Sequence, residues 1–116
     1  MPAAKLKLKI EQGATFRKSL DWKSNEIPVD LTGYSARMQM RNPIDSPVII
    51  HELSTENGGI NFSDVQNGQI ELFISATNTS AFAFDSCVYD LEMVASNGDV
   101  IRLLEGEISL SKEVTR

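Results

Sequence analysis

A two-residue alternation of apolar and polar side chains constrains this chain more than any other feature of its sequence. The segment "VDLTGYSARMQMR", from Val29 to Arg41, begins with turn residues and then alternates strictly. Its methionines share one face, and Arg37, Gln39 and Arg41 share the other. Successive side chains of a β-strand point to opposite faces of a sheet, so this pattern predicts a strand with one buried and one exposed face.

The same alternation recurs in segments spaced about ten residues apart, separated by glycine, proline and asparagine. The expected strands lie within 5–11, 15–22, 34–41, 48–53, 60–63, 69–75, 87–95 and 100–111. Residues 23–30 are expected to form a loop. Residues 76–84 lose the alternation and predict a short helical turn near 77–82, capped by Thr77, that crosses between sheets. We therefore expect an all-β chain forming one domain over residues 1–116, an antiparallel β-sandwich of seven or eight strands; a small closed barrel is the alternative.

Several residues are expected to shape the turns between these strands. Gly13 separates the first two strands, and Asp30 and Thr32 can bond local backbone while Gly33 takes a positive φ. Asn97 and Gly98 predict a two-residue hairpin turn. Gly106, inside the last expected strand, indicates a bulge or a point of close packing.

The net charge of −5 argues against a general nucleic-acid binder, because binding phosphates favours a positive surface. The charge is uneven. Residues 1–23 carry six basic and two acidic side chains, whereas residues 24–116 carry five basic and fourteen acidic ones. This asymmetry indicates either solvated strand faces or complementary ends that attract neighbouring copies or partners. Apolar runs are too short to span a bilayer, and no signal peptide is expected at the N-terminus.

No residue pattern in the sequence points to catalysis, a cofactor or a metal. His51 is the only histidine and lacks a nucleophile motif, so we expect a surface or partly packed side chain and no enzyme. Cys87 is the only cysteine, which excludes an intrachain disulfide and fits folding in a reducing cytosol. It has no partner at metal-ligand spacing, and the acidic residues near Asp90 predict a solvated face.

Five phrases of the sequence resemble small structural proteins of tailed phages: "EQGATF", "PVDLTGYSARMQMR", "TENGGI", "SCVYDLEMV" and "RLLEGEISLSKEVTR". "DLTGY" and "YDLE" followed by "NGD" are also similar to the N-terminal, immunoglobulin-like domain of phage baseplate upper proteins. We expect no coiled coil or receptor-binding module within this sequence, so the resemblance does not imply fibre attachment through one. In an immunoglobulin-like sandwich, Tyr89 stands where a tyrosine corner would place its hydroxyl against upstream backbone.

The resemblance implies a non-enzymatic virion protein of the tail, baseplate or fibre-attachment region, made in the host cytoplasm. Its partners would be other virion proteins and copies of itself, with no membrane and no nucleic acid. We expect contacts from outward-facing basic side chains, namely Lys5, Lys7, Lys9, Arg37 and Arg41. The alternative is a small module that binds host-surface carbohydrate, which requires an exposed aromatic such as Trp22 or Tyr34 at a strand end.

Overall fold

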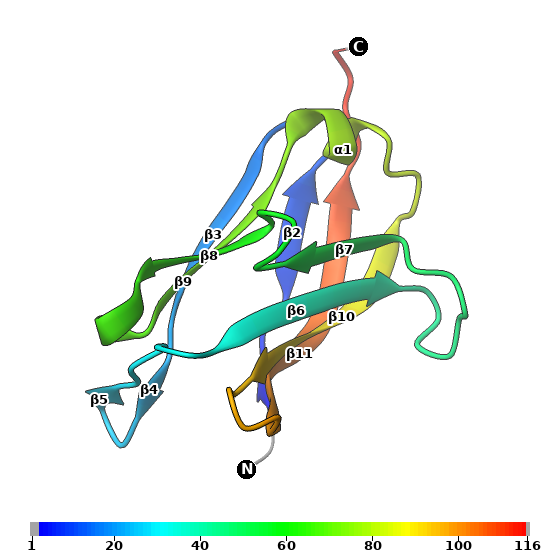
Figure 1. Ribbon diagram of the computed structural model, residues 1–116. Coiled ribbons are helices and arrows are strands. Elements are labelled where there is room, and N and C mark those ends of the chain that lie inside the picture. Colours follow the sequence, from blue (N-terminus) through cyan, green and yellow to red (C-terminus); the bar gives the residue numbers. More distant parts are fainter. Residues whose placement is uncertain (1–2, 116) are drawn as a thin grey trace.

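Two β-sheets enclose one hydrophobic core in the computed structural model, which describes residues 3–115 (Figure 1). The strands are β1 (Ala4–Lys5), β2 (Leu8–Glu11), β3 (Phe16–Asp21), β4 (Lys23–Ser24), β5 (Ile27–Pro28), β6 (Ser35–Arg41), β7 (His51–Ser54), β8 (Ile60–Asp64), β9 (Gln69–Ile74), β10 (Ser86–Val94) and β11 (Val100–Ser111). The large sheet has the order β1-β11-β10-β6-β7, and β2 also pairs with β11. The small sheet has the order β3-β9-β8. The chain is therefore mostly β, as predicted.

The core is built from the alternation seen in the sequence. In β6 and β10 every second residue is buried, and the same holds for β9 in the small sheet. The buried side chains of these three strands are Ala36, Met38, Met40, Cys87, Tyr89, Leu91, Met93, Ile70, Leu72 and Ile74. Burial of this apolar surface, at about 25 cal/mol per Å², is the main force holding the sheets together.

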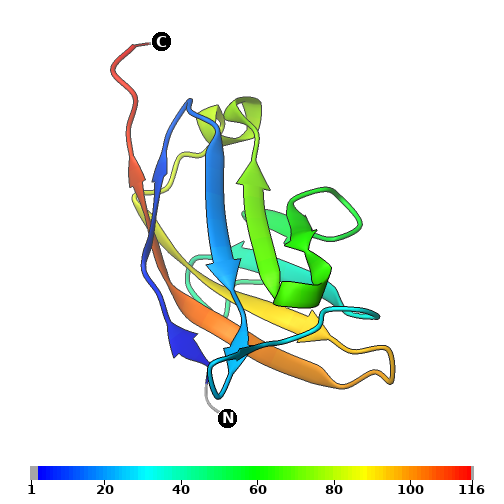
Figure 2. The ribbon, with the colours of Figure 1, turned by 90° about the vertical axis from the view of Figure 1, so that its left-hand side faces the viewer.

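The N-terminal strand is where the predicted antiparallel arrangement is wrong. Both β1 and β2 pair with β11 in parallel, with Ala4 opposite Leu104 and Leu8 opposite Ile108. The other strand pairs of the large sheet are antiparallel. Alternation cannot distinguish the two directions, because side chains alternate between faces in parallel and antiparallel strands alike. Figure 2 shows β2 beside β11 at one margin of the large sheet.

The region 23–30, predicted to be a loop, contains the two-stranded ribbon β4–β5. Asn25 and Glu26 both have positive φ, at 52° and 66°, so they form the two central residues of a tight turn. Glutamate is rarely found in this conformation, and the sequence therefore gave no hairpin signal here. Counting this ribbon and the split of the N-terminal strand into β1 and β2, residues 3–115 contain eleven strand segments rather than seven or eight.

The predicted helical crossover is present as α1 (Ala76–Ser80), which links β9 of the small sheet to β10 of the large one. Its N-cap is Ser75, not the predicted Thr77: the Ser75 side chain accepts a hydrogen bond from the Asn78 N–H at 3.2 Å. The only other helical segment in the described part of the chain is a 3₁₀ turn at Val65–Asn67.

The turn before β6 forms as predicted. The Asp30 carboxylate accepts hydrogen bonds from the Thr32 N–H and hydroxyl, at 2.9 and 2.6 Å, and these bonds lower the pKa of Asp30. Gly13 and Gly33 have positive φ, at 85° and 83°. Leu31, inside the turn before β6, is buried in the core. Local side-chain chemistry was therefore sufficient to place this turn.

The β10–β11 hairpin differs from the predicted two-residue turn. The Ala95 N–H donates to the Asp99 carbonyl at 2.8 Å, and the Gly98 N–H donates to the Ala95 carbonyl at 2.9 Å. These bonds enclose a three-residue loop, residues 96–98, in which Gly98 (φ 93°) has positive φ and Asn97 does not. A type I turn followed by a left-handed glycine is a common solution for three-residue hairpins, so the same two residues serve a different turn.

Gly106 is a point of close packing and not a bulge. A Cβ at this position would lie 2.2 Å from the carbonyl oxygen of Leu6. The register shift of β11 falls instead between Arg102 and Leu104. The Tyr89 hydroxyl donates to the same Leu6 carbonyl at 2.6 Å. This acceptor is upstream backbone, but it lies 83 residues away, so the bond ties the N-terminal strand to β10 and is not a local tyrosine corner.

Candidate protein-interaction surfaces

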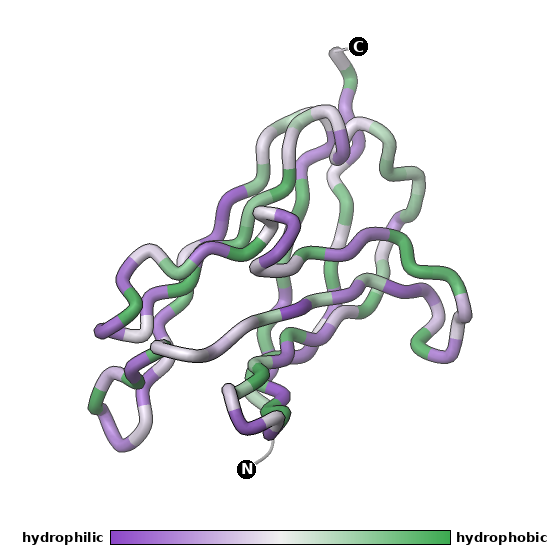
Figure 3. The backbone as a smooth tube through the Cα atoms, viewed as in Figure 1, coloured by the Kyte–Doolittle hydropathy of each residue, from purple (hydrophilic) through white to green (hydrophobic). Residues whose placement is uncertain are grey.

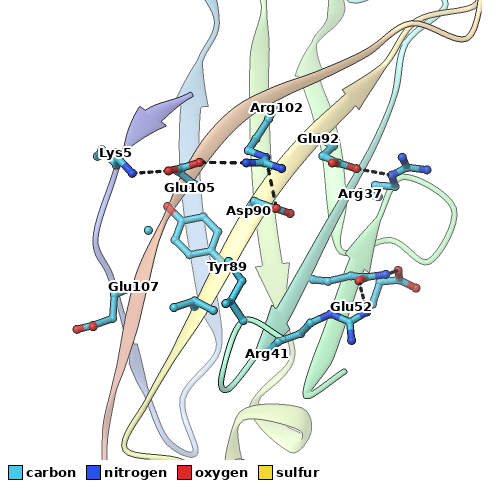
Figure 4. Close-up of a pocket in the computed structure, with 14 residues that line it drawn as sticks. Lys5, Arg37, Arg41, Glu52, Tyr89, Asp90, Glu92, Arg102, Glu105 and Glu107 are labelled. Atoms are coloured by element: carbon cyan, nitrogen blue, oxygen red, sulfur yellow. Dashed lines mark hydrogen bonds and ion pairs between the residues drawn. The ribbon is translucent and has the colours of Figure 1, made fainter. Parts of the chain in front are cut away.

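The outward side of the large sheet carries a concave, highly charged surface, which we call the charged sheet face. It encloses about 850 Å³ and is drawn in Figure 4. Its principal lining residues are Lys5, Arg37, Gln39, Arg41, Ile44, Glu52, Val88, Asp90, Glu92, Arg102, Glu105 and Glu107. Three of the five basic residues predicted to make contacts, Lys5, Arg37 and Arg41, therefore lie on one surface.

Strand alternation and register bring these side chains together. The residues of β6 and β10 that are not in the core all face outward, and the antiparallel register sets Arg37 opposite Glu92 and Gln39 opposite Asp90. Cross-strand neighbours of opposite charge attract each other, whereas like charges in the same positions would destabilise the sheet. The face is therefore a patterned array of both signs, and not a patch of one sign.

One group of ion pairs joins β1, β10 and β11. Lys5 pairs with Glu105, and Arg102 lies 3.4 Å from Glu105 and 3.5 Å from Asp90 (Figure 4). The hydrogen bond from Lys5 lowers the pKa of Glu105. Burial raises the pKa of Asp90, and the neighbouring Glu92 raises it further, while Arg102 acts in the opposite direction. Asp90 is thus the least favourably placed carboxylate of the group.

Arg37 and Arg41 are both bonded within the chain. The Arg37 Nε donates to Glu92 at 2.8 Å. Solvent-exposed ion pairs contribute only about 0.2–1 kcal/mol, so Arg37 can exchange this contact for one with a partner protein at little cost. The Arg41 guanidinium donates to the Ser46 carbonyl at 2.6 Å and to the Gln39 side chain at 2.9 Å. Its clearest role is to hold the loop that follows β6.

That loop, residues 42–50, presents exposed aliphatic side chains, and we call it the apolar loop. The side chains of Ile44, Val48 and Ile49 are 74%, 66% and 40% exposed. Figure 3 shows hydrophobic stretches of the loop at the right of the view. The sequence predicted that Val48 and Ile49 begin a strand, but β7 starts only at His51, which leaves both outside the sheet. Ile44 also lines the charged sheet face.

Lys7 and Lys9 lie elsewhere, in a groove between β2 and β3 that we call the basic groove. It encloses about 370 Å³, and its lining includes Lys7, Lys9, Glu11, Arg17 and Lys18. Arg17 is turned away toward the small sheet, since it lies 3.4 Å from Glu71 and 4.7 Å above the Phe73 ring. The five predicted contact residues are thus divided between two surfaces.

His51 and Cys87, the residues considered for catalysis or metal binding, both pack against other side chains of the chain. His51 packs edge-on against Phe82, with ring centroids 5.6 Å apart, and burial lowers its pKa. Cys87 is buried in the core, and burial raises the pKa of its thiol to about 12. Over residues 3–115 no group of three or more His, Cys, Asp and Glu side chains is arranged to hold a metal ion.

Trp22 and Tyr34 both lie at strand ends, as the carbohydrate alternative required. Their rings pack edge to face with centroids 5.4 Å apart, and both side chains are partly buried against the core. They therefore form a packed pair and not an open platform.

Sequence reasoning missed the apolar loop. Its available signal was a set of aliphatic residues beside two prolines, where strand pairing is unfavourable: Ile44 lies between Pro43 and Pro47, and Val48 and Ile49 follow Pro47. In the sequence, Lys18 is a polar residue in the same alternation as Phe16 and Leu20. Whether its side chain is buried or exposed depends on where β3 lies in the sheet.

None of the known protein families has a model that matches this chain, and no curated protein matches it either. Among the described residues, no helix is long and apolar enough to cross a membrane.

Proposed function

We propose that this chain is a non-enzymatic structural protein of a tailed-phage virion. In this proposal it forms a single immunoglobulin-like sandwich and binds other virion proteins, or copies of itself, in a symmetric assembly of the tail, baseplate or fibre-attachment region. It is made and folded in the bacterial cytoplasm before assembly. The support for the phage setting is the resemblance of the quoted phrases, chiefly "PVDLTGYSARMQMR" and "SCVYDLEMV", to virion proteins.

The observation that carries the contact role is the composition of the charged sheet face beside the apolar loop. Lys5 comes from β1 at one margin of the large sheet, and Arg37 and Arg41 both come from β6. All three line one concave surface, together with Ile44. Protein interfaces commonly combine a small apolar anchor with a polar, charged rim. The exposed Ile44 supplies the anchor, and the ion pairs supply the rim.

Electrostatics and apolar burial would have separate tasks in such an interface. Exposed ion pairs add little affinity, but a fixed pattern of charges selects the register of the partner and speeds association. Burial of one isoleucine side chain contributes about 1.5–3 kcal/mol. In this proposal the apolar loop contributes most of the binding energy, and the arginines and glutamates contribute most of the specificity.

The first test is the protein composition of purified particles of a phage whose genome encodes this chain. Mass spectrometry of those particles is expected to find the chain at a fixed ratio to the major tail proteins. Its absence from intact particles would refute the virion assignment.

The second test separates the proposed surface from the rest of the molecule. Ile44→Asp is expected to reduce incorporation into particles about tenfold or more, because it puts a charge in place of the exposed side chain that the partner would bury. Ile27→Asp is the matched control, since Ile27 on β5 is 67% exposed and does not line the face. Equal incorporation of both variants would rule out this face as the contact.

A carbohydrate-binding module remains the alternative prediction. The packed Trp22–Tyr34 pair offers no specific support for it, and a glycan array with the purified protein is its direct test.

A further inference from the structure

The basic groove is bordered by two strand edges that carry no partner strand. Within residues 3–115, β2 pairs only with β11 and β3 pairs only with β9. The groove between them therefore lies at a margin where the large and small sheets are not hydrogen-bonded to each other. Free strand edges expose backbone N–H and C=O groups that can pair with another chain.

The hydrogen-bond pattern identifies which backbone groups point into the groove. The N–H groups of Leu6 and Gln12 donate to β11 residues Glu105 and Ser111. Backbone groups of a strand alternate in direction, so the N–H and C=O of Lys9, an odd-numbered residue, point away from β11. In the small sheet the Trp22 N–H donates to the Gly68 carbonyl, which by the same alternation turns the backbone of Arg17 toward the free edge.

The side chains at this opening are predominantly basic. Lys7, Lys9 and Lys18 line the groove, and no ion pair or side-chain hydrogen bond involves any of the three in the described chain. Lys18 stands opposite Leu72, in the phase of β3 that faces the core, yet it is exposed because β3 is an edge strand. Glu11 is the single carboxylate in the lining.

We propose that the basic groove binds an extended, acidic segment of a partner protein by strand addition to β2. The partner's backbone pairs with the free groups around Lys9, which extends the large sheet by one strand. Its alternate side chains face Leu8 and Phe16 at the opening, so they are apolar. The remaining side chains face Lys7 and Lys9, so they are acidic.

The length of β2 limits this contact. Its four residues span about 13 Å at 3.3 Å per residue, which suits a short segment and not a broad sheet-to-sheet interface. The groove is separate from the charged sheet face, so this inference goes beyond the proposed function and does not depend on it.

Lysines on edge strands also have a purely protective use, since they discourage edge-to-edge aggregation. The two roles differ in one respect that can be measured. Protection predicts that no acidic strand binds, and that removing the lysines makes the protein associate with itself. Recognition predicts saturable binding that depends on both the charge and the backbone N–H groups of the added segment.

The experiment uses the full chain and a fluorescein-labelled peptide of alternating valine and glutamate, followed by fluorescence anisotropy. We expect saturable binding that weakens as salt is raised, because salt screens exposed charges. Two comparison peptides are included: alternating valine and lysine, and the valine–glutamate peptide with N-methylated backbone. Neither is expected to bind, since one has the wrong charge and the other cannot form the strand hydrogen bonds.

The variant Lys7→Glu/Lys9→Glu is expected to weaken binding at least about tenfold through like-charge repulsion. Lys23→Glu/Lys112→Glu is the matched control, because it changes the net charge equally, at positions outside the groove. Circular dichroism confirms that both variants fold, and amide hydrogen exchange of the wild type is expected to show slower exchange at Lys9 when the peptide is bound.

Three results would overturn the proposal. The first is no binding of the valine–glutamate peptide, with self-association of Lys7→Thr/Lys9→Thr. The second is equal weakening in the groove variant and the control. The third is undiminished binding of the N-methylated peptide. Because particle incorporation of Ile44→Asp is measured separately, failure here leaves the virion assignment standing.

Discussion

Replacing Gly106 by alanine tests how the N-terminal strand is held to the large sheet. The added Cβ would lie 2.2 Å from the Leu6 carbonyl oxygen and 3.0 Å from its carbon. Favourable non-bonded contact begins near 3.5 Å, so the Leu6 backbone must move by roughly 1 Å. That oxygen is backbone and cannot be relieved by a change of rotamer.

The displacement removes two hydrogen bonds at Leu6. One is the bond from the Tyr89 hydroxyl at 2.6 Å, and the other is the bond from the Leu6 N–H to the Glu105 carbonyl at 3.0 Å. Each is worth about 1 kcal/mol, and overpacking typically costs about 1–3 kcal/mol. Alanine restricts the unfolded chain and returns about 0.4–1 kcal/mol. We expect a net loss of about 2–5 kcal/mol.

The assay is urea unfolding at 25 °C, followed by circular dichroism, for Gly106→Ala, Tyr89→Phe and the double variant. Tyr89→Phe alone is expected to cost about 1 kcal/mol, since it leaves the Leu6 carbonyl without its donor. In the double variant this cost is expected to vanish, because the alanine has already broken the same hydrogen bond.

Gly98→Ala provides the control. Nothing lies within 4 Å of a Cβ built on Gly98, but its φ is 93°, so alanine there is strained without a steric clash. Its effect is expected to add to that of Tyr89→Phe. A cost below about 0.5 kcal/mol for Gly106→Ala, or additivity with Tyr89→Phe, would refute the reasoning.

Three further predictions concern buried or partly buried polar groups. The Cys87 thiol is expected to be unreactive toward a thiol reagent in the native protein at pH 8 and reactive after unfolding. Since burial raises its pKa from 9.0 to about 12, the contribution of the thiol to stability is present below pH 9 and is lost as the pH rises toward 12. Cys87→Ala is expected to remove this loss from the pH dependence of unfolding. Asp90→Asn is expected to stabilise the fold slightly at pH 7 and to have no effect near pH 2, because a raised carboxyl pKa disfavours folding only once the group ionises; a lower melting temperature at pH 7 would contradict this. Thr79→Val is expected to cost about 1–3 kcal/mol in urea unfolding, because the buried hydroxyl donates to the Ala14 carbonyl at 2.8 Å and accepts from the Gly13 N–H at 3.1 Å; an unchanged midpoint would mean that water replaces these bonds.

The candidate surfaces were predictable only in part. Strand alternation correctly predicted that the side chains of Arg37, Arg41 and the N-terminal lysines face outward. It could not predict that Lys5 lines the same surface as Arg37 while Lys7 and Lys9 line a different groove. That division depends on the parallel pairing of β1 and β2 with β11, which is a contact about a hundred residues apart in sequence.

The errors have a shared physical origin in contacts between distant segments. Val48 and Ile49 have high strand propensity, yet β7 pairs with β6 only from His51 onward. The two residues therefore have no neighbouring strand to pair with, and propensity alone does not form a strand. Gly106 is required by the Leu6 backbone, and Tyr89 bonds the same residue, so neither role can be read from neighbouring sequence.

The sequence by itself determined the class of the chain, the faces of its strands and the turn at Asp30, because side-chain alternation and Asx hydrogen bonds are local effects. Tertiary structure alone decided strand order, the parallel N-terminal margin, the burial of Tyr89 against Leu6 and the exposure of Lys18. The physical reason is that an edge is defined by the absence of a neighbouring strand, and which strands become neighbours depends on how the whole chain buries its apolar faces.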